Sequence, residues 1–549
     1  MRKQTKIAAV VSAAALLALG ASITSFAASR GTWMLVDGEW YCYDSHGDVY
    51  ENTFCVSNGK DYYVGDDGML VRSSWVEYDG DYYFVNSAGQ KITNDWRLTT
   101  PYEDEDAEEQ WFYFQASGKR AEDKKLTIKG KTYFFDADGQ MLIGWVQENG
   151  DSYEEASSDI AGNEGDFSYC DESGARVENA WVWDYAPDVD ADEADSDDYE
   201  HWYWMGSDGH PDTGKKNNIE GQTYLFGENG RMLTGWVATT DSNYSDKDAY
   251  VSIQKTVEDE DQFTDLKDIA SYGGEVYYCT EDDGHVKKNK WIKLWNTEDA
   301  YDVDDDNTQY WFYIEKTGEV YVPSSNDADA ITEAVKHKFE DGKIVENGNN
   351  PGIEVIKHRV NGKDYFFNRD GEMISNFILV EEASDDLKAG LYYLGGSDDG
   401  VMKTGSVSIA DDTGESYRFY FGTKDSEGGK GVGYTGNKSG KLYYDGMLIT
   451  ANDYKYAVVE VTDSVCFIVN QSGSIQHSNT SYKEDGDTLI RTKFDADEGE
   501  TEADNTVFYD KSDDGVEDWM DDGFVDESAL LYLDPSLGVE TARDMVYDY

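Results

Sequence analysis

The sequence predicts an all-β protein: a linear array of stacked β-hairpins, or β-solenoid, with acidic loop insertions. Three observations predict it. A phrase of alternating aromatics, turn formers and glycine at Lys131–Trp145 returns almost unchanged at Gly221–Trp236 and more loosely at Gly80–Trp96. The apolar residues are largely aromatic, with 41 Tyr, 21 Phe and 15 Trp in 549 residues. The 53 Gly fall regularly after aromatic clusters beside only 6 Pro. Self-similarity at a short period is typical of repeat architectures.

Residues 1–27 are predicted to be a secretory signal peptide. Arg2, Lys3 and Lys6 form a basic start, an apolar stretch runs from residue 7 to 21, and Ser25-Phe26-Ala27 offers a small-x-small cleavage site. The alternative is a retained membrane anchor, but the apolar run is short for a bilayer span. We therefore expect a secreted protein of the cell wall or cell surface, with no membrane insertion after cleavage.

Each copy of the phrase is interpreted as one hairpin. In the copy at residues 131–145, Tyr133 and Phe135 share one face of the first strand, while Asp136–Gly139 supplies the turn. Met141 and Trp145 then share a face of the return strand. A lone hairpin is marginal in water, so each copy has to bury its aromatic face against its neighbours.

Copies of the hairpin are expected throughout residues 28–450, with a degenerate one at Phe339–Gly342. The leading aromatics of the copies are Trp40, Tyr62, Tyr82, Trp111, Tyr133, Phe167, Trp202, Tyr224, Tyr277, Trp311, Tyr365, Tyr392, Phe419 and Tyr443. Residues 451–549 are predicted to contain degenerate repeats and an acidic C-terminal cap or tail. The shortest spacing between copies is about 20 residues, as expected for a short repeated unit.

Wider spacings are due to acidic insertions, which nearly all follow the Trp of a copy. They lie at 99–109, 184–200, 239–268 and 297–308. Insertions at one point of the unit leave the stacked face undisturbed and direct the loops to one side of the array. Their composition predicts mobility rather than packing.

The charge of the chain excludes nucleic acid as a partner. The formal net charge is −67, and the loss of three cations with the leader moves it to about −70. Polyphosphates need a basic surface, and bare anionic polymers are repelled as well. A cationic group on the recognised polymer would instead be attracted.

Five cysteines, at positions 42, 55, 170, 279 and 466, are an odd number and lie far apart. A disulfide framework therefore cannot include all of them. Most are interpreted as packing residues in strand positions. A bridge between Cys42 and Cys55 is the one pairing that the secreted context suggests.

At residues 133–145 and 224–236 the chain resembles the cell-wall-binding repeats of Gram-positive surface proteins, a family that includes choline-binding and glucan-binding modules. The resemblance extends from about residue 30 to 450. It implies a stack of hairpins with ligand sites between consecutive units, each a cage of aromatics with a Met or Leu at its base. Aromatic faces hold a quaternary ammonium by cation–π attraction, and neutral sugars stack on the same faces.

Carried over by position, the resemblance implies that the Trp after Gly and the leading aromatic of the next hairpin form each cage, with Met as the floor. The implied ligand-binding residues are Trp75, Tyr82, Trp96, Trp111, Trp145, Trp181, Trp202, Trp236, Trp291, Trp311, Met141 and Met232. The expected pairings are Trp75 with Tyr82, Trp96 with Trp111, Trp181 with Trp202, and Trp291 with Trp311. Tyr133 and Tyr224 stand where many relatives have Trp.

Other residue patterns give weaker indications of a catalytic site or a metal site. The seven His show no metal spacing, each Cys occupies a strand position, and no segment outside the repeats is large enough for a catalytic cleft. Asp510–Asp521 resembles a calcium loop, and the acidic runs at 188–193 and 302–306 offer further carboxylates, but a solvated loop accounts for each. We expect no enzyme activity, no metal and no cofactor.

The sequence thus predicts a secreted, non-catalytic protein that attaches to an envelope polymer, choline-substituted teichoic acid or a glucan, through aromatic sites between repeats. The alternative is a structural or adhesive repeat protein whose aromatics are all core and whose acidic loops bind a host or partner surface. Aromatics at hairpin positions are more often core than ligand contacts.

Overall fold

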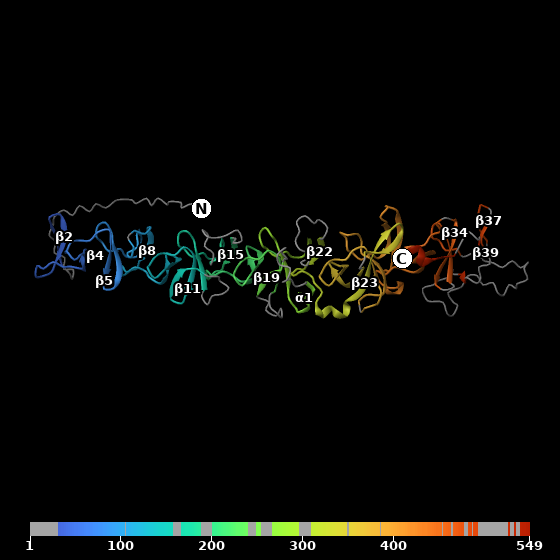
Figure 1. Ribbon diagram of the computed structural model, residues 1–549, viewed down its shortest axis with the longest axis horizontal. Helices are drawn as coiled ribbons and strands as arrows, with labels where there is room; N and C mark the ends of the chain where they lie inside the picture. The colour runs from blue at the N-terminus through green and yellow to red at the C-terminus, as the bar shows by residue number, and fades with distance from the viewer. Residues whose placement is uncertain are drawn as a thin grey trace, which may run out of the picture. The chain divides into compact units, whose positions relative to one another are not determined.

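A computed structural model of the chain confirms the all-β class (Figure 1). It describes residues 31–157, 166–187, 200–239, 249–253, 266–295, 309–491, 525–526, 532–533 and 539–548, except positions 105, 349–350, 385, 453, 463–464, 477–480 and 486. The predicted signal peptide, the calcium-like loop at 510–521 and the acidic runs at 188–193 and 302–306 lie outside these residues.

The chain divides into two compact units, Met1–Leu233 and Thr234–Tyr549. The boundaries predicted above, at residues 27 and 450, stay predictions. In the first unit every hydrogen-bonded pair of strands is antiparallel. Its strands are β1 (Thr32–Val36), β2 (Glu39–Tyr43), β3 (Thr53–Ser57), β4 (Lys60–Val64), β5 (Ser74–Tyr78), β6 (Asp81–Val85), β7 (Asp95–Thr99), β8 (Gln110–Phe114), β9 (Lys124–Ile128), β10 (Lys131–Phe135), β11 (Gly144–Asn149), β12 (Ser152–Glu155), β13 (Asp166–Cys170), β14 (Ala180–Asp184), β15 (His201–Met205), β16 (Gly214–Ile219) and β17 (Gln222–Phe226).

The second unit begins with two sheets of the same kind and continues with larger ones. The first two contain β18 (Gly235–Thr239), β19 (Tyr250–Ser252), β20 (Val276–Cys279), β21 (Lys290–Trp295) and β22 (Gln309–Ile314). A six-stranded sheet contains β23 (Thr332–Glu340), β24 (Lys343–Glu346), β25 (Gly352–Val360), β26 (Lys363–Phe367), β27 (Phe377–Val380) and β28 (Gly390–Tyr393), and a five-stranded sheet contains β29 (Gly405–Ala410), β30 (Ser416–Phe421), β31 (Gly436–Lys438), β32 (Lys441–Tyr444) and β33 (Met447–Leu448).

The last sheets contain the only parallel pair of strands among those described, β34 with β40. They are formed by β34 (Tyr456–Thr462), β35 (Val465–Asn470), β38 (Val525–Asp526) and β40 (Val539–Thr541), and by β36 (Ser481–Glu484), β37 (Asp487–Arg491) and β39 (Tyr532–Leu533). The described helices are α1 (Leu266–Ser271), α2 (Ala542–Val546) and the 3₁₀ turns η2 (Ser325–Ala330) and η3 (Asp425–Glu427). None of the described helices is long and apolar enough to cross a bilayer.

The prediction of where each hairpin turns was wrong by half a repeat. Asp136–Gly139 does not close a hairpin; β10 pairs with the preceding strand β9 through the turn at Lys129–Gly130. Both turn residues have positive φ, 52° and 83°, as the tight two-residue turns of hairpins require. Trp145 therefore lies in the first strand of the next hairpin, where it faces Tyr169 of β13.

The segment that was expected to be a return strand joins one hairpin to the next. The carboxylate of Asp136 accepts the N–H of Gln140 at 2.7 Å, and Met141 makes a single bridge to Phe135. Met141 also donates its backbone N–H to the carbonyl oxygen of Trp111 at 2.9 Å, in the preceding hairpin. We call this second residue after the turn glycine the floor residue of a repeat.

The same link recurs along the chain. The floor N–H donates to the preceding hairpin at Leu70, Lys91, Arg120, Met141, Arg176, Met232, Val320, Met373 and Met402. Proline replaces the donor at Pro211. In the repeats that have this bond, one backbone hydrogen bond from the floor residue joins each hairpin to the one before it.

Turn glycines provide the space for this stacking. A Cβ on Gly174 would lie 2.2 Å from the Sδ of Met141, and a Cβ on Gly139 would lie 2.6 Å from the Cδ of Arg120. The floor side chain of one repeat thus lies against the turn glycine of the next. Both glycines also have positive φ, which other residues adopt at a cost.

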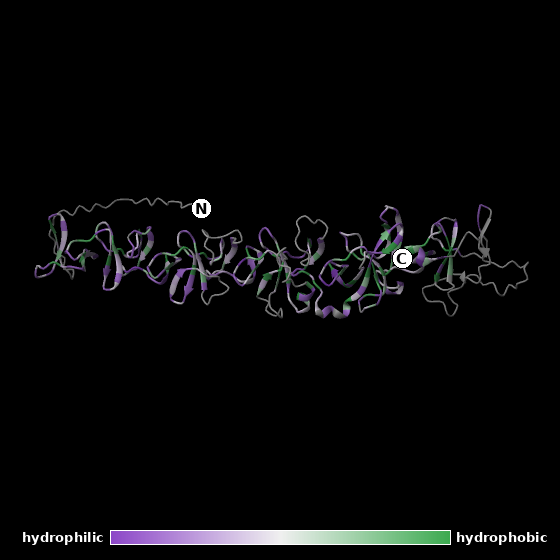
Figure 2. Ribbon diagram, viewed as in Figure 1, coloured by the Kyte–Doolittle hydropathy of each residue, from purple (hydrophilic) through white to green (hydrophobic). Residues whose placement is uncertain are grey.

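In the first unit aromatic side chains form much of the core, in small clusters between neighbouring hairpins. Phe84, Phe112 and Phe114 form one cluster, and Val182, Tyr203 and Met205 belong to another. Hydrophobic and hydrophilic residues are interspersed along most strands (Figure 2), as period-two side-chain alternation requires.

All five cysteines are buried free thiols, as the packing interpretation predicted. Cys42 and Cys55 lie in one core cluster with Val64. A hydrogen bond to Cys55 and then burial raise the pKa of the Cys42 thiol. The proposed bridge between them is therefore not formed in this structure, although the two side chains are in contact.

The described C-terminal residues pack into the core of the second unit. Ala542, Val546 and Tyr547 share a cluster with Ile344 of β24 and Phe339 of β23. The hairpin predicted at Phe339–Gly342 is confirmed as β23 and β24. The described helix α2 thus belongs to the core of the second unit, and the prediction of a cap or tail for residues 451–549 stays a prediction.

A buried carboxylate in the second unit leads to a prediction of how the stability of the fold depends on pH. Burial alone would raise the pKa of Glu427, but hydrogen bonds from Lys438 (2.6 Å) and Thr423 (2.8 Å) outweigh it and lower that pKa to about 2. A lowered folded-state pKa stabilises the fold above the ordinary value of 4.5, and this contribution disappears as the pH falls toward 2. At pH 7, Glu427→Gln is expected to lower the free energy of unfolding by about 2 kcal/mol.

Denaturant unfolding at a series of pH values checks this prediction. The difference between the wild type and Glu427→Gln should shrink steadily between pH 4.5 and 2. A difference that stays constant over that range would show that the carboxylate charge contributes nothing.

Candidate functional site

The candidate site is a set of four positions that most of the described hairpins place together. The first wall is the second residue of the hairpin's first strand. The second wall is the residue whose carbonyl accepts the floor N–H, and the third wall lies eight residues before the floor residue, in the next hairpin. What a given hairpin can do depends on the side chains at these four positions.

The Trp96 cluster consists of Trp96, Trp111, Tyr133 and the floor residue Met141. The ring centroids of Trp96 and Trp111 are 6.4 Å apart with planes at 88°, and those of Trp96 and Tyr133 are 5.0 Å apart at 64°. Trp111 is 40% exposed, a large fraction for an indole in this aromatic core. This cluster therefore presents perpendicular aromatic faces partly to solvent.

The Trp181 cluster consists of Trp181, Trp202, Tyr224 and the floor residue Met232, and it repeats that geometry. Trp181 and Trp202 are 6.1 Å apart at 82°, and Trp181 and Tyr224 are 4.9 Å apart at 71°. Trp202 is 39% exposed. Met232 packs against the same group of side chains as Trp181. Two separate hairpins thus carry nearly congruent clusters.

Two further hairpins also have two Trp and one Tyr as walls, with Leu or Met as the floor. These are the Trp33 cluster, with Trp33, Trp40, Tyr62 and Leu70, and the Trp291 cluster, with Trp291, Trp311, Tyr365 and Met373. The Trp33 and Tyr62 rings lie 5.8 Å apart, and the Trp291 and Tyr365 rings 4.7 Å.

The four clusters recur at every third hairpin along the chain. They begin on β1, β7, β14 and β21, the first, fourth, seventh and tenth of the described hairpins. Two Trp, one Tyr and a Leu or Met floor occur together at none of the other described hairpins up to β22. The repeats therefore have a three-hairpin period that the short phrase alone does not reveal.

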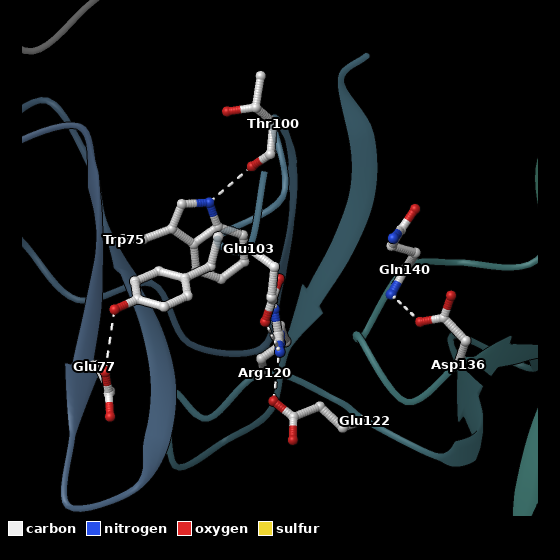
Figure 3. A network of polar contacts seen from close by, with 9 residues as sticks. Trp75, Glu77, Thr100, Glu103, Arg120, Glu122, Asp136 and Gln140 are labelled. Carbon is white, nitrogen blue, oxygen red and sulfur yellow. Dashed lines mark hydrogen bonds and ion pairs between the residues drawn. The ribbon is translucent and has the colours of Figure 1, made fainter. Parts of the chain in front are cut away.

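The Trp75 cluster, between two of these hairpins, is already occupied by a side chain of the protein (Figure 3). Its floor residue is Arg120, whose Cζ lies 4.3 Å from the Tyr82 ring centroid, 5.4 Å from Trp75 and 6.0 Å from Phe112. The side chain of Arg120 is only 2% exposed. A guanidinium thus lies over the rings of both Trp75 and Tyr82, while their expected pairing as a ligand site stays a prediction.

Carboxylates from two segments hold this guanidinium. Glu103 accepts Nη2 at 2.9 Å and Nη1 at 3.2 Å, and Glu122 accepts Nε at 2.8 Å. Burial disfavours the charge on Arg120, but these hydrogen bonds outweigh burial and raise its pKa. Burial likewise opposes ionisation of Glu103, yet the bonds from Arg120 lower the pKa of its carboxyl.

Trp145 and Trp236, which best match the repeat phrase, are buried instead. Trp145 is 7% exposed and packs on Tyr203 at 4.8 Å, and Trp236 is 3% exposed and packs on Phe312 at 4.9 Å. Each indole also donates to a backbone carbonyl, that of Tyr185 or Trp295, at 3.0 Å. Both are core residues in this structure. The candidate ligand-binding residues are therefore the more exposed Trp residues.

The last expected pairing, Trp291 with Trp311, has two charged side chains beside it. Trp311 donates its indole N–H to Asp398 at 2.8 Å, and Lys293 lies over the Trp311 ring at 5.8 Å while pairing with Asp398 at 3.1 Å. A lysine and a carboxylate thus lie beside this cluster.

The two Trp of each expected pair lie on the two strands of one hairpin, not on consecutive hairpins. Trp96 lies on β7 and Trp111 on β8, and the third wall, Tyr133, comes from the next hairpin. Sequence reasoning did not place Trp33, Tyr133, Tyr224 and Tyr365 in these clusters. Their signal is the constant eight-residue separation from the floor residue.

Among the described residues no group of His, Cys, Asp and Glu could hold a metal ion. His285 has a local partner instead, because its Nδ1 lies 2.6 Å from Asp283. The aromatic clusters remain the candidate site of the described chain.

Comparisons with known proteins bear on this site. No family model matches the chain. The chain is 24% identical over 378 residues to glucosyltransferase-S of Streptococcus mutans, which covers 63% of this chain and 20% of that protein. It is 26% identical over 126 residues to a putative endo-beta-N-acetylglucosaminidase of Streptococcus pneumoniae, 23% of this chain and 14% of that protein. The chain thus spans a fifth or less of these two relatives.

Solved structures of Streptococcus pneumoniae proteins also match. The structure of CbpJ has 16% identity and a TM-score of 0.34, over 66% of this chain and 99% of that chain. The modular autolysin LytC has 16% identity and a TM-score of 0.32, over 63% of this chain and 52% of that chain. The choline-binding domain of CbpL has 20% identity and a TM-score of 0.26, over 38% and 88%.

The sequence matches, to a glucosyltransferase and to a putative endo-beta-N-acetylglucosaminidase, stand beside the resemblance that the repeat phrase indicated. The resemblance of this chain to the choline-binding and glucan-binding repeat family is confirmed.

Proposed function

We propose that this protein is a secreted, non-catalytic binding protein that attaches to a cell-envelope polymer through the Trp96 and Trp181 clusters. The observation that carries the proposal is the congruence of the two clusters, each with an exposed Trp beside a second Trp, a Tyr and a Met floor. An exposed indole that lies against three further apolar side chains forms an apolar surface, and such surfaces favour a ligand.

The first candidate ligand is a quaternary ammonium such as the choline of a substituted teichoic acid. Aromatic faces at right angles attract such a cation from several sides, by about 0.5–2 kcal/mol for each desolvated contact. The net charge of −67 favours a cation further. In the Trp75 cluster the chain itself places a cation over equivalent rings.

The second candidate ligand is a glucan. The sequence match to a glucosyltransferase over 63% of this chain favours it, since such an enzyme acts on glucosyl groups. Flat Trp and Tyr faces combine an apolar ring with a polar group, so sugar rings can also stack on them. The two ligands differ in charge, so one experiment separates them.

Retention on a resin that bears choline tests the first candidate. A protein this acidic binds any cationic resin by charge alone, so the column is washed with about 1 M NaCl, where the screening length is about 3 Å. We expect the protein to stay bound in that wash and to elute when choline replaces sodium at equal ionic strength. Elution by NaCl alone contradicts the choline assignment, and sedimentation with an insoluble glucan then tests the second candidate.

A further inference from the structure

Resting on the proposed function, we infer that Arg120 is the resident cation of the Trp75 cluster, and that its guanidinium closes there a latent site for an organic cation. The floor residue would thus determine which hairpins bind an external ligand. Met leaves the aromatic faces available, whereas Arg covers them with its own guanidinium.

The first argument is position. Arg120 and Met141 are equivalent floor residues, each donating its backbone N–H to the second wall of its own cluster, Tyr82 at 2.8 Å and Trp111 at 2.9 Å. Around Arg120 the rings of Tyr82 and Trp75 lie 4.3 and 5.4 Å from the guanidinium carbon. Among the described residues, no lysine or arginine lies over the indoles of Trp96 or Trp111.

The second argument is that specific hydrogen bonds and burial hold the Arg120 guanidinium in place. The guanidinium makes three hydrogen bonds to two carboxylates, and the side chain is 2% exposed. A buried charge of this kind is stable only when it is paired on several sides. Figure 3 shows Arg120 between Glu103 and Glu122, beside the Trp75 indole.

The acidic insertion at 99–109 completes the closure. It supplies Glu103, and its Thr100 carbonyl accepts the Trp75 indole N–H at 2.8 Å. Tyr102 of the same insertion lies 4.7 Å from the Tyr82 ring and donates its hydroxyl to Glu77 at 3.1 Å. This insertion therefore covers the cluster with aromatic and acidic side chains, which gives it a role in the site.

The preceding hairpin shows the same device with lysine. The floor residue Lys91 lies 4.9 Å from the Phe54 ring and 5.4 Å from the Tyr83 ring, and it pairs with Asp61 at 2.6 Å. Asp61 occupies the second-wall position, where the Trp75 cluster has Tyr82. Two consecutive hairpins thus carry an internal cation between aromatic faces, and the next one, with Met141, carries none.

The chain also supplies a matched control. Arg176 is a floor residue too, and it pairs with Glu178 two positions later at 2.6 Å, as Arg120 does with Glu122. Its second wall is Thr132 and its third wall is Ser168, so no aromatic faces surround it at those positions. Removing that arginine frees a floor position without opening an aromatic site.

Thermal unfolding of the full-length variants Arg120→Met and Arg176→Met tests the inference, with tetramethylammonium chloride as the probe and NaCl at equal ionic strength as the reference. A ligand that binds only the folded state raises the unfolding temperature in proportion to the sites it fills. We expect the probe to raise that of Arg120→Met by about 3 °C more than that of the wild type. Arg176→Met should respond as the wild type does.

Equal responses from folded Arg120→Met and the wild type would overturn the inference, whatever the wild type binds. If Arg120→Met does not fold, Arg120→Lys keeps a cation in place and should show no response beyond the wild type; an added response would overturn the inference as well. The choline column tests the wild type alone, so a failure there is distinguishable from a failure here.

Discussion

Replacing Trp236 by alanine is expected to lower the free energy of unfolding of the second unit by about 3–5 kcal/mol, the range for truncating a buried aromatic. The indole is 3% exposed and packs edge-on against Phe312 at 4.9 Å and Tyr278 at 5.6 Å. Its N–H donates to the carbonyl of Trp295 at 3.0 Å, and that acceptor would lose its partner. Chemical denaturation followed by circular dichroism measures the loss.

Trp111→Ala is the control for that result. Its side chain is 40% exposed, so the same truncation should cost about 1 kcal/mol or less. Trp236, a first-wall residue, and Trp111, a second-wall residue, are thus expected to differ several-fold in their effect on stability. Equal losses would show that Trp111 is a core residue and would argue against the Trp96 cluster as a site.

Binding to the choline resin is expected to depend on the exposed Trp residues, whose truncation should cost little stability. Trp111→Ala and Trp202→Ala each remove one wall of a cluster, and each should weaken retention on the choline resin by about tenfold, from a cation–π loss of about 1–2 kcal/mol. The double variant should lose more than either single one, because two sites on one chain act together on a polymer.

The matched variant for this experiment is Trp183→Ala. Trp183 is 47% exposed and lies 5.1 Å from Trp202, but it occupies none of the four positions that define a cluster. Retention of this variant should equal that of the wild type, with unchanged circular dichroism. A loss of retention as large as that of Trp202→Ala would show that the binding surface is not the Trp181 cluster.

Much of the architecture could be predicted because it depends on local chemistry. Alternating aromatics indicate strands, and glycine at regular intervals indicates turns, so the all-β class and the repeated hairpins follow from the residues themselves. The turn position was misjudged because Asp136–Gly139 and Lys129–Gly130 both look like turns. Only the pairing of β10 with β9 distinguishes them.

The choice among the tryptophans depended on the fold. Trp145 and Trp236 best match the phrase, yet neighbours distant in sequence, Tyr203 and Phe312, cover them. Trp111 and Trp202 have no such cover over two fifths of their surface. Exposure is a property of the packed hairpins, so no pattern within one copy could rank these residues.

By itself, the sequence determined that this protein is a β-hairpin repeat array with aromatic faces, because strand alternation and turn glycines act within a few residues. The tertiary structure decided which aromatic faces stay accessible and which hold an internal cation. That outcome is set where a floor residue meets the rings of two hairpins and, at Arg120, a carboxylate from an acidic insertion.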